Sequence, residues 1–455
     1  MLKIKRLVIF ISLALLLVYF IVLISNTTFS NNTNDSSSDI DNDDNYSYLN
    51  DRYTKQQQLK QIVVDTVKNH NNEITTNRLN STSSFSISII IPLYNQLKYI
   101  KYTLDSLVTQ SISLQQSYTW EVIIVDDFSS EWMAKERLLE IYNEYSTIFT
   151  TITLIFNSKN LGLSECRNIG ITYSKGIWIL PLDADDLIHS EFLEKSLKLL
   201  KNKHNNLNNN ILVSNMYKFV SESNFQDDKI VGQWNIPKWD SSIIPNRNLL
   251  HCSSIFRKSL WEMVGGYSNE LWFGWEDWEF WLRSDRTLQN TTGTGLSVDI
   301  VGGDNPMFYY RIKPGLHSFC GDEYRLCFAM FQTVNPHLYA VDDIILAHRY
   351  ISTRGKLIRQ PIQKRIKQFP NLPILYFWMG LIEFHSFSNL KVSKEHFENA
   401  LKLNLNSNHD WQFMLQYSLV LKETRNGYFQ SKSQLDQLFD KYSHINLKHN
   451  FNKFY

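Results

Sequence analysis

Residues 176–186 read GIWILPLDADD, an apolar run that leads directly into a group of aspartates. Such a run is typical of a buried strand, and the acidic residues follow where the strand ends. Ile87–Pro92 is a second continuous apolar run, and Glu121–Val125 is a third that leads into Asp126-Asp127. Continuous apolar strands are characteristic of parallel sheets, because both faces of such sheets are covered. These stretches therefore predict a buried parallel sheet.

Segments with helical spacing separate the predicted strands. They span Leu97–Gln110, Trp132–Tyr145 and Ser164–Ser174, and a further strand is predicted at Thr151–Phe156. Strands that alternate with helices of about ten residues or more form a parallel sheet with helices on both faces. We therefore predict an α/β domain over residues 86–334. After about residue 335 the strand pattern stops, and we predict an α-helical region over 335–455.

Two of the predicted strands end in neighbouring carboxylates, Asp126-Asp127 and the group Asp183, Asp185 and Asp186. Ligands of open α/β sheets bind outside the carboxyl ends of the strands. Carboxylates this close repel one another, so a bound cation or a donor-rich ligand is a natural reason to keep them. The alternative is turn chemistry, since Asp is common just after strands and at helix N-caps.

The composition excludes several classes of protein. The 455 residues suffice for two domains, and 46 Lys and Arg residues against 45 Asp and Glu residues give a net charge of +1. Nucleic-acid-binding domains are usually strongly basic, so we expect no nucleic-acid partner. A hydrophobic share of 43% excludes wholesale disorder. Four cysteines without a Cys-x-x-Cys pair exclude a disulfide scaffold and make a structural zinc site unexpected.

The amino terminus predicts a membrane anchor. Lys3, Lys5 and Arg6 precede an apolar run, Leu7–Ile24, of about 18 residues, which is about 27 Å long as a helix. The positive flank stays cytosolic, so we predict a cytosolic tail (1–6), a transmembrane signal-anchor (7–25) and a luminal remainder in the Golgi or another secretory-pathway membrane. A cleaved signal peptide is the alternative.

A flexible luminal stem is predicted over residues 26–85, because most of its first half is Asn, Ser and Asp and cannot bury a core. Asn-x-Ser/Thr acceptors for glycosylation fit a luminal chain. They begin at Asn26, Asn31, Asn34, Asn45, Asn80 and Asn290.

The predicted helical region contains two features of interest. Residues 349–369 are basic, which favours a solvated helix face or linker, with an acidic acceptor site as the sharper alternative. Residues 373–405 resemble a tetratricopeptide-type helix pair, with Gly380, Phe397 and Ala400 near the expected places. We expect this region to pack on the α/β domain and to help bind an acceptor molecule or a protein partner.

Six segments of the chain resemble the family 2 glycosyltransferases, which have a GT-A fold with a Rossmann-like, mostly parallel sheet. They stand in the order of the family, within a match that extends over roughly residues 86–318, about half of the chain. The segments are SISIIIPLYNQ (86–96), EVIIVDDFSS (121–130), NLGLSECRNIGI (160–171), GIWILPLDADD (176–186), SSIFRKSLWEMVGGYSNELWFGWEDWEFWLR (253–283) and MFYYRIKP (307–314).

The resemblance implies a binding site for a nucleotide-sugar donor. Pro92, Tyr94 and Asp127 are implied to hold the base, with Asp127 accepting a hydrogen bond from a uracil or a similar imide. Arg167 is implied to contact the base or a phosphate, and Arg311 either contacts the diphosphate or braces its loop. A uracil contact favours UDP over GDP as the nucleotide.

The resemblance also implies a bound Mn²⁺ or Mg²⁺. Asp185 is the expected direct ligand, and Asp183 lies nearer the ribose as its D-x-D partner. Hard oxygen ligands favour these ions over zinc. His317 is a candidate third ligand, although many family members place a His of a His-Pro-Gly-Ser pattern where this chain has Lys313.

Glu276 and Asp277 resemble the acidic pair on the acceptor side, with Asp277 as catalytic base. Among the nearby tryptophans, Trp278 and Trp281 are expected in the helix core, whereas Trp272 and Trp275 could stack on a sugar face. The implied function is a metal-dependent, inverting hexosyl- or N-acetylhexosaminyl-transfer from a nucleotide sugar to a glycan or glycoconjugate hydroxyl. The alternative is an inactive GT-A domain that binds glycans or serves as a scaffold.

Overall fold

The computed structural model describes residues 73–76, 86–111, 120–149, 151–202, 210–221, 229–313, 319–403, 412 and 415–417. The predicted tail and membrane anchor, most of the predicted stem, and His317 lie outside these residues. All of the described residues belong to one unit that starts at Gln56. Within the described part, no helix is both long enough and apolar enough to cross a bilayer.

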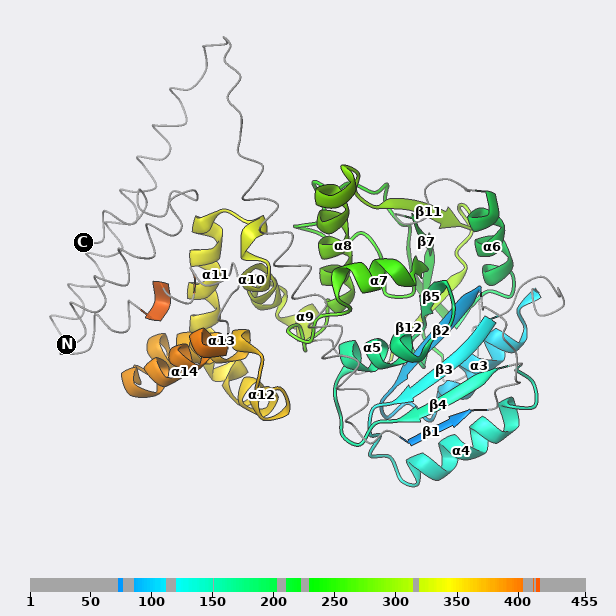
Figure 1. The fold of residues 1–455 in the computed structure, drawn as a ribbon, viewed down its shortest axis with the longest axis horizontal. Helices are drawn as coiled ribbons and strands as arrows, with labels where there is room; N and C mark the ends of the chain where they lie inside the picture. Colours follow the sequence, from blue (N-terminus) through cyan, green and yellow to red (C-terminus); the bar gives the residue numbers. More distant parts are fainter. Residues whose placement is uncertain are drawn as a thin grey trace, which may run out of the picture. The chain divides into compact units, whose positions relative to one another are not determined.

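A six-stranded sheet forms the centre of the α/β domain (Figure 1), which confirms the predicted fold class. Its four inner strands are parallel, and the edge strands β1 and β10 pair antiparallel to them. The order is β1 (Glu73–Thr76), β4 (Ile152–Phe156), β3 (Trp120–Asp126), β2 (Ile87–Leu93), β5 (Trp178–Pro181) and β10 (Phe256–Arg257).

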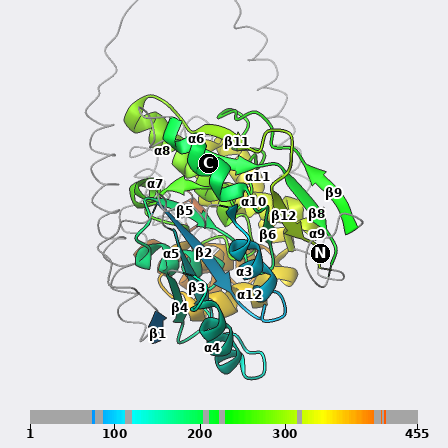
Figure 2. The same cartoon turned by 90° about the vertical axis from the view of Figure 1, so that its right-hand side faces the viewer.

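Helices cover both faces of this sheet (Figures 1 and 2). Successive strand residues point to opposite faces, so Ile90 packs in the cluster that includes α5, whereas Ile89 and Ile91 pack in the cluster that includes α3 and α4. The strands read as unbroken apolar runs because both faces are buried. The helix bounds are α3 (Ile100–Val108), α4 (Ala134–Tyr145) and α5 (Leu163–Tyr173), each within a few residues of the prediction.

Gly170 lets α5 approach the sheet closely. A Cβ atom at this position would stand 2.4 Å from the Cγ2 atom of Ile90 in β2. Arg167 lies one helical turn before Gly170, so this close packing carries Arg167 to the carboxyl end of the strands.

A smaller layer of strands follows the central sheet. It contains a four-stranded sheet, β6-β12-β8-β9, and the parallel pair β11-β7. Here β12 pairs with β6, the strand directly after the aspartates of residues 183–186, and thereby brings Arg311 to them. The bounds are β6 (Leu187–Ile188), α6 (Phe192–Asn202), β7 (Asn210–Ser214), β8 (Met216–Phe219), β9 (Ile230–Trp234), α7 (Lys258–Val264), α8 (Glu276–Thr292), β11 (Ser297–Val301) and β12 (Phe308–Arg311).

The part of 335–455 that the structure describes is mostly helical, as predicted, and two helices, α9 and α10, already precede residue 335. Gly380 in α13 contacts α14 closely: a Cβ there would stand 2.6 Å from the ring of Phe397. A tetratricopeptide-type repeat remains a prediction for this pair. The bounds are α9 (Phe319–Asp322), α10 (Tyr324–Val334), a 3₁₀ turn (Pro336–Leu338), α11 (Val341–Thr353), α12 (Gly355–Gln368), α13 (Pro373–His385) and α14 (Leu390–Leu403).

A disulfide joins Cys320 in α9 to Cys327 in α10. The cysteine count excludes a disulfide scaffold but does not reveal this single bridge. Cys166 and Cys252 are free. The α10 helix also contacts both parts of the chain, because Phe331 stacks on Trp278 of α8 and the Trp378 indole of α13 donates to the Thr333 hydroxyl.

Candidate functional site

The loops after β2 and β3 are tied together at the carboxyl edge of the sheet. Asn95, at φ +54°, accepts a hydrogen bond from the Ser130 backbone N–H at 2.8 Å, and its own N–H donates to the Ser129 hydroxyl at 2.9 Å. Tyr94 stands beside this junction with 45% of its surface exposed, whereas Pro92 is buried in β2. Tyr94 is therefore accessible to a ligand at this edge.

Asp127 closes the loop between β4 and α5. Its carboxylate accepts hydrogen bonds from the backbone N–H groups of Leu161 and Gly162, both at 2.7 Å, and from the Asn157 amide at 3.0 Å. Burial raises the pKa of Asp127, and these hydrogen bonds oppose the rise. The structure thus places Asp127 in the network of this loop, and its contact with a base remains a prediction.

Arg167 connects the predicted donor and acceptor sides of the site. Its guanidinium has no exposed surface and donates to the Asp183 carboxylate at 2.8 Å and to the Glu276 carboxylate at 2.5 Å. It also lies 5.5 Å from the ring centroid of Tyr267. Burial alone would lower the pKa of Arg167, but the two carboxylates raise it further, so the guanidinium stays charged.

The remaining aspartates of residues 183–186 are fastened to the end of β12. The Lys313 ammonium contacts the Asp185 carboxylate at 2.5 Å, and both side chains are less than one-fifth exposed. Arg311 donates from its backbone N–H to Asp186 at 2.9 Å and from Nε to the Asp185 carbonyl at 2.7 Å. The Arg311 guanidinium also lies 4.9 Å from the centre of the Tyr99 ring. In this structure Arg311 braces the loop.

The oxygen donors of Asp183 and Asp185 suit Mn²⁺ or Mg²⁺. Mg²⁺ sites in nucleotide-binding proteins commonly use one or two carboxylates, with phosphate oxygens and water as the other ligands. No set of three His, Cys, Asp or Glu side chains forms a metal site within the described ranges, so a donor diphosphate would have to supply further ligands. Asp183 already has Arg167 as a partner and Asp185 has Lys313, so a metal at Asp185 would compete with Lys313.

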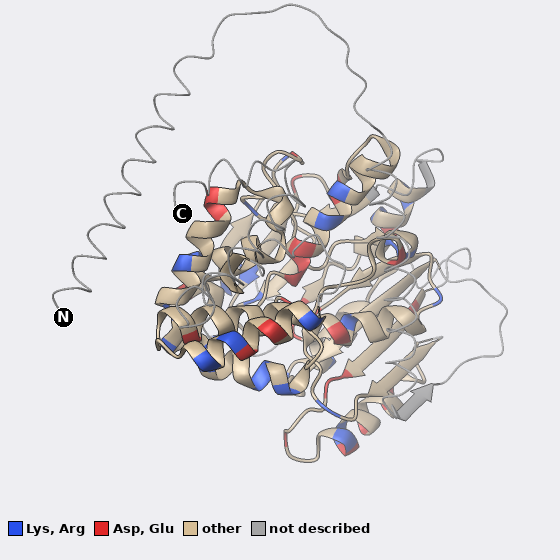
Figure 3. Cartoon of the chain, turned by 60° about the vertical axis from the view of Figure 1, so that its left-hand side comes forward, with Lys and Arg blue, Asp and Glu red and all other residues tan. Residues whose placement is uncertain are grey.

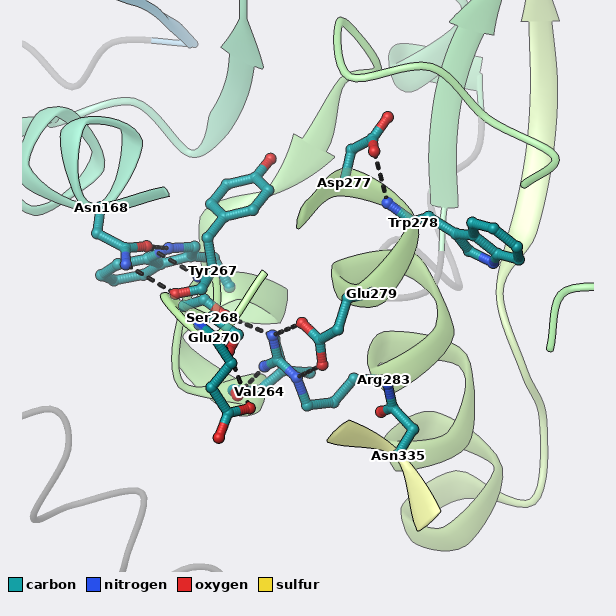
Figure 4. Close-up of polar contacts among 12 residues, drawn as sticks. Asn168, Val264, Tyr267, Ser268, Glu270, Asp277, Trp278, Glu279, Arg283 and Asn335 are labelled. Carbon is teal, nitrogen blue, oxygen red and sulfur yellow. Dashed lines mark hydrogen bonds and ion pairs between the residues drawn. The ribbon is translucent and has the colours of Figure 1, made fainter. Parts of the chain in front are cut away.

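The α8 helix begins at the predicted acidic pair. Gly274 at φ +115° and Trp275 at φ +67° form the corner, and the helix starts at Glu276. Figure 4 shows Asp277 in the first turn, where its carboxylate accepts from the Trp278 backbone N–H at 2.7 Å. Burial, followed by the charge of Glu276, raises the pKa of Asp277 to about 7. A carboxylate with this pKa is suited to act as a base near neutral pH.

Two clamps tie α8 and α5 to the same loop after α7 (Figure 4). Arg283 pairs with Glu279 through two contacts of 2.6 Å and donates to the Gly266 carbonyl at 2.9 Å. Asn168 accepts from the Tyr267 backbone N–H at 2.8 Å and donates to the Tyr267 carbonyl at 2.9 Å. The residues on both sides of the Arg167 bridge are therefore held by hydrogen bonds of their own.

The tryptophans around Asp277 divide between core and site. Trp278 and Trp281 are buried, as predicted for the helix core. Trp275 packs on Trp278 and on Tyr324 of α10, with ring centroids 5.0 and 5.2 Å apart. Trp272 lines a pocket together with Glu276.

The structure adds residues that sequence reasoning did not assign to the site. Asn168 follows Arg167 directly, so its position in the motif was the available signal. Lys313 was visible only as a departure from the family pattern. Tyr267, whose buried hydroxyl has no partner among the described residues, carried no signal of its own.

Comparison with known proteins supports the resemblance over part of the chain. Residues 88–260 match the model of Glycosyl transferase family 2. A Haemophilus influenzae protein named as an uncharacterized glycosyltransferase is 39% identical over 119 residues, covering 26% of this chain and 36% of that protein. The Erwinia amylovora amylovoran biosynthesis glycosyltransferase AmsB is 29% identical over 140 residues, covering 31% of this chain and 44% of that protein.

Among solved structures, the crystal structure of S. aureus TarS 1–349 in complex with UDP-GlcNAc is similar at 19% identity with a TM-score of 0.41, and covers 76% of this chain and 93% of that chain. The chain thus spans less than half the length of the two curated relatives. The match to the Glycosyl transferase family 2 model, residues 88–260, includes Asp127, Arg167, Asp183 and Asp185 and ends before Glu276.

Proposed function

We propose that the chain is a glycosyltransferase that moves a sugar from a nucleotide-sugar donor, with UDP as the favoured nucleotide, to a hydroxyl of a glycan or glycoconjugate. The observation that carries this proposal is the Arg167 bridge. It joins Asp183, in the acidic group after β5, to Glu276, the neighbour of Asp277. The acids assigned to the donor side and to the acceptor side thereby contact the same buried cation, which supports a single site for two substrates.

On the donor side, charge develops on the diphosphate as the sugar leaves. A divalent ion held by Asp183 and Asp185 would neutralise this charge as a Lewis acid. Lys313 and Arg311 lie against the same loop and add positive charge from the chain itself. Preorganised cations of this kind stabilise developing charge without reorganising during the reaction.

On the acceptor side, Asp277 takes the proton of the attacking hydroxyl. A positioned base typically accelerates such a step by about 10²–10⁴-fold. With a single base on the face opposite the leaving diphosphate, the reaction is a direct displacement that inverts the anomeric carbon. Arg167 neutralises the neighbouring Glu276, so Glu276 is held in place as a partner of the bridge.

The function is tested by offering a panel of UDP- and GDP-sugars to the purified chain without its first 50 residues, with Mn²⁺ or Mg²⁺, and measuring hydrolysis. We expect turnover of at least one UDP-sugar.

Asp185→Ala should weaken metal-dependent donor binding by at least about tenfold, because Asp185 is the expected metal ligand. The exposed Asp304→Ala is the matched control. Calorimetry with equal donor affinity in metal and in chelator would exclude the metal role.

Lys313→Gln tests the same metal site and should have the opposite effect to Asp185→Ala. Removing the ammonium frees Asp185, so the affinity for Mn²⁺ alone should rise by about tenfold, the ratio that corresponds to about 1.4 kcal/mol. Lys101→Gln removes an exposed ion pair with Glu144 and should leave Mn²⁺ binding unchanged. Unchanged Mn²⁺ affinity in Lys313→Gln would show that the ion does not bind at Asp185.

We also propose that the chain is a single-pass protein of a secretory-pathway membrane with its catalytic domain luminal. The support is the charged and apolar pattern of residues 1–24 together with the Cys320–Cys327 disulfide, since disulfides persist in oxidising compartments. Mass spectrometry of the mature protein should find residues 1–6 retained. A new amino terminus near Asn26 would instead indicate a cleaved signal peptide.

A further inference from the structure

One basic side chain of the helical region, that of Arg365, lies beside the candidate site. The basic stretch 349–369 contains seven Lys and Arg residues, and Figure 3 shows such residues mixed with acidic ones along the helices. Arg359 of this stretch pairs with Glu383 at 2.6 Å, within the helical region. Arg365 of α12 behaves differently: its Nη2 atom lies 3.1 Å from the position that a Cβ would take on Gly162. Arg365 therefore packs directly on the residue before α5.

Arg365 forms part of a pocket that also borders the acceptor-side acids. The other walls are residues 162–164 at the start of α5 and the loop before α8, with Trp272 and Glu276. Glu276 and Asp277 are the first two residues of α8, so a group bound in this pocket would lie at the amino end of the helix that carries the proposed base. The helical region thus supplies one wall of a pocket in the catalytic domain.

The negative charges around this pocket already have partners. Glu276 binds Arg167 at 2.5 Å, and Asp127 accepts the N–H groups of Leu161 and Gly162. An anion entering the pocket therefore meets carboxylates that already accept hydrogen bonds from the chain.

Arg365 has fewer charged partners than these carboxylates have donors. Its Nη1 donates to the Gln368 amide oxygen at 3.0 Å, and its guanidinium stacks 4.3 Å from the Phe369 ring centroid, so the side chain is oriented in advance. Within the described residues it forms no ion pair, and its buried Nε has no hydrogen-bond partner. Burial lowers the pKa of Arg365 to about 10, and the negative charge of Asp127 opposes this decrease. The guanidinium is therefore protonated at neutral pH.

The start of α5 adds to the positive potential. This helix of 11 residues begins at Leu163 with no side-chain cap. The N-terminus of a helix carries a partial positive charge that favours anions.

We propose that Arg365, with the start of α5, binds an anionic group of the acceptor, a carboxylate or a phosphate, in the pocket at the amino end of α8. This inference rests on the proposed transfer function and names the class of its acceptor. It also assigns a role to the helical region, which would select acceptors by their charge. Of the two readings of the basic stretch, the structure favours an acidic acceptor site at this one residue.

The test compares the binding of β-glycerophosphate, glucuronate and uncharged glucose by calorimetry. We expect one anionic probe to bind at least tenfold more tightly than glucose, and the probe that does so distinguishes a phosphate from a carboxylate. Arg365→Met should abolish this preference, because it keeps the apolar stem and removes the charge. Lys367→Met, exposed on the same helix, is the matched control and should keep it. Affinity for UDP should not change in either variant.

Arg365→Lys guards against a purely structural effect. This variant retains the positive charge and should keep part of the preference for the anionic probe over glucose. Its thermal midpoint is expected to match that of Arg365→Met, so the two variants differ in charge and not in stability. The proposal is overturned if the wild-type chain shows no preference for an anionic probe, or if Arg365→Met binds the anionic probe as tightly as the wild type. Donor hydrolysis without any acceptor is measured separately, so a failure of the transfer function is distinguishable.

Discussion

Asp277→Asn is expected to lower kcat by about 10²-fold or more, because the amide keeps the size and hydrogen bonding of the side chain but cannot accept a proton. Affinity for the donor should change little, since the donor is proposed to bind through Asp183 and Asp185 and not through Asp277. Asp342→Asn, an exposed acid in the first turn of α11, is the control and should leave kcat unchanged. Steady-state kinetics with the donor identified in the hydrolysis panel would measure both parameters.

The pH dependence gives a second measure of the same residue. Asp277 acts as a base only when ionised, and its pKa is raised to about 7. The value of kcat/KM in the wild type should therefore fall as the pH drops below about 7, and this decrease at acidic pH should be absent in Asp277→Asn.

The product, followed by NMR, should have the anomeric configuration opposite to that of the donor. A retained configuration, or near-normal kcat in Asp277→Asn, would contradict the single-displacement mechanism.

Arg167→Met is expected to cost about 3–5 kcal/mol of the free energy of unfolding. Removing one partner of a buried ion pair leaves the other charge buried without compensation, and here two carboxylates, Asp183 and Glu276, lose the same cation. Denaturant unfolding at neutral pH would measure the loss. Arg354→Met, at an Arg side chain that is 46% exposed, should cost less than about 1 kcal/mol.

A double variant separates the charge effect from lost packing. Glu276→Gln removes one of the two stranded charges, so Arg167→Met/Glu276→Gln should be more stable than Arg167→Met alone. Neighbours that share an interaction deviate from additivity in this way. Additive losses, or a stability of Arg167→Met equal to that of the wild type, would show that the bridge contributes little.

The sheet could be predicted because its physical causes are local in sequence. A strand buried on both faces must be apolar throughout, so Ile87–Pro92 and Ile177–Leu182 were visible without any partner. The ends of parallel strands lie at one edge, which is why Asp127, Asp183 and Asp185 could be assigned to a common site. The small sheet that contains β12 was not predicted, since its strands are short and only partly buried.

The contacts that complete the site depend on packing between distant segments. Lys313 meets Asp185 only because β12 pairs with β6, and no short-range pattern encodes that pairing. Arg365 reads as one of seven basic residues until α12 places it on Gly162. Trp275 has the sequence context of a sugar-stacking residue, but the rings of α10 enclose it. In each case the missing information was which helix or strand would become the neighbour.

The contacts between α5 and residues 261–276 have a consequence for where this chain can be divided. Asn168 binds the Trp261 indole and the backbone of Tyr267, and Arg167 binds Glu276, yet all three partners lie beyond residue 260, where the family match stops. A protein shortened to that match would leave the buried amide of Asn168 without these partners and the buried guanidinium of Arg167 with Asp183 as its one remaining carboxylate, and unpaired buried polar groups are costly. The segment that matches the family model is therefore shorter than the piece of this chain whose contacts hold the candidate site together.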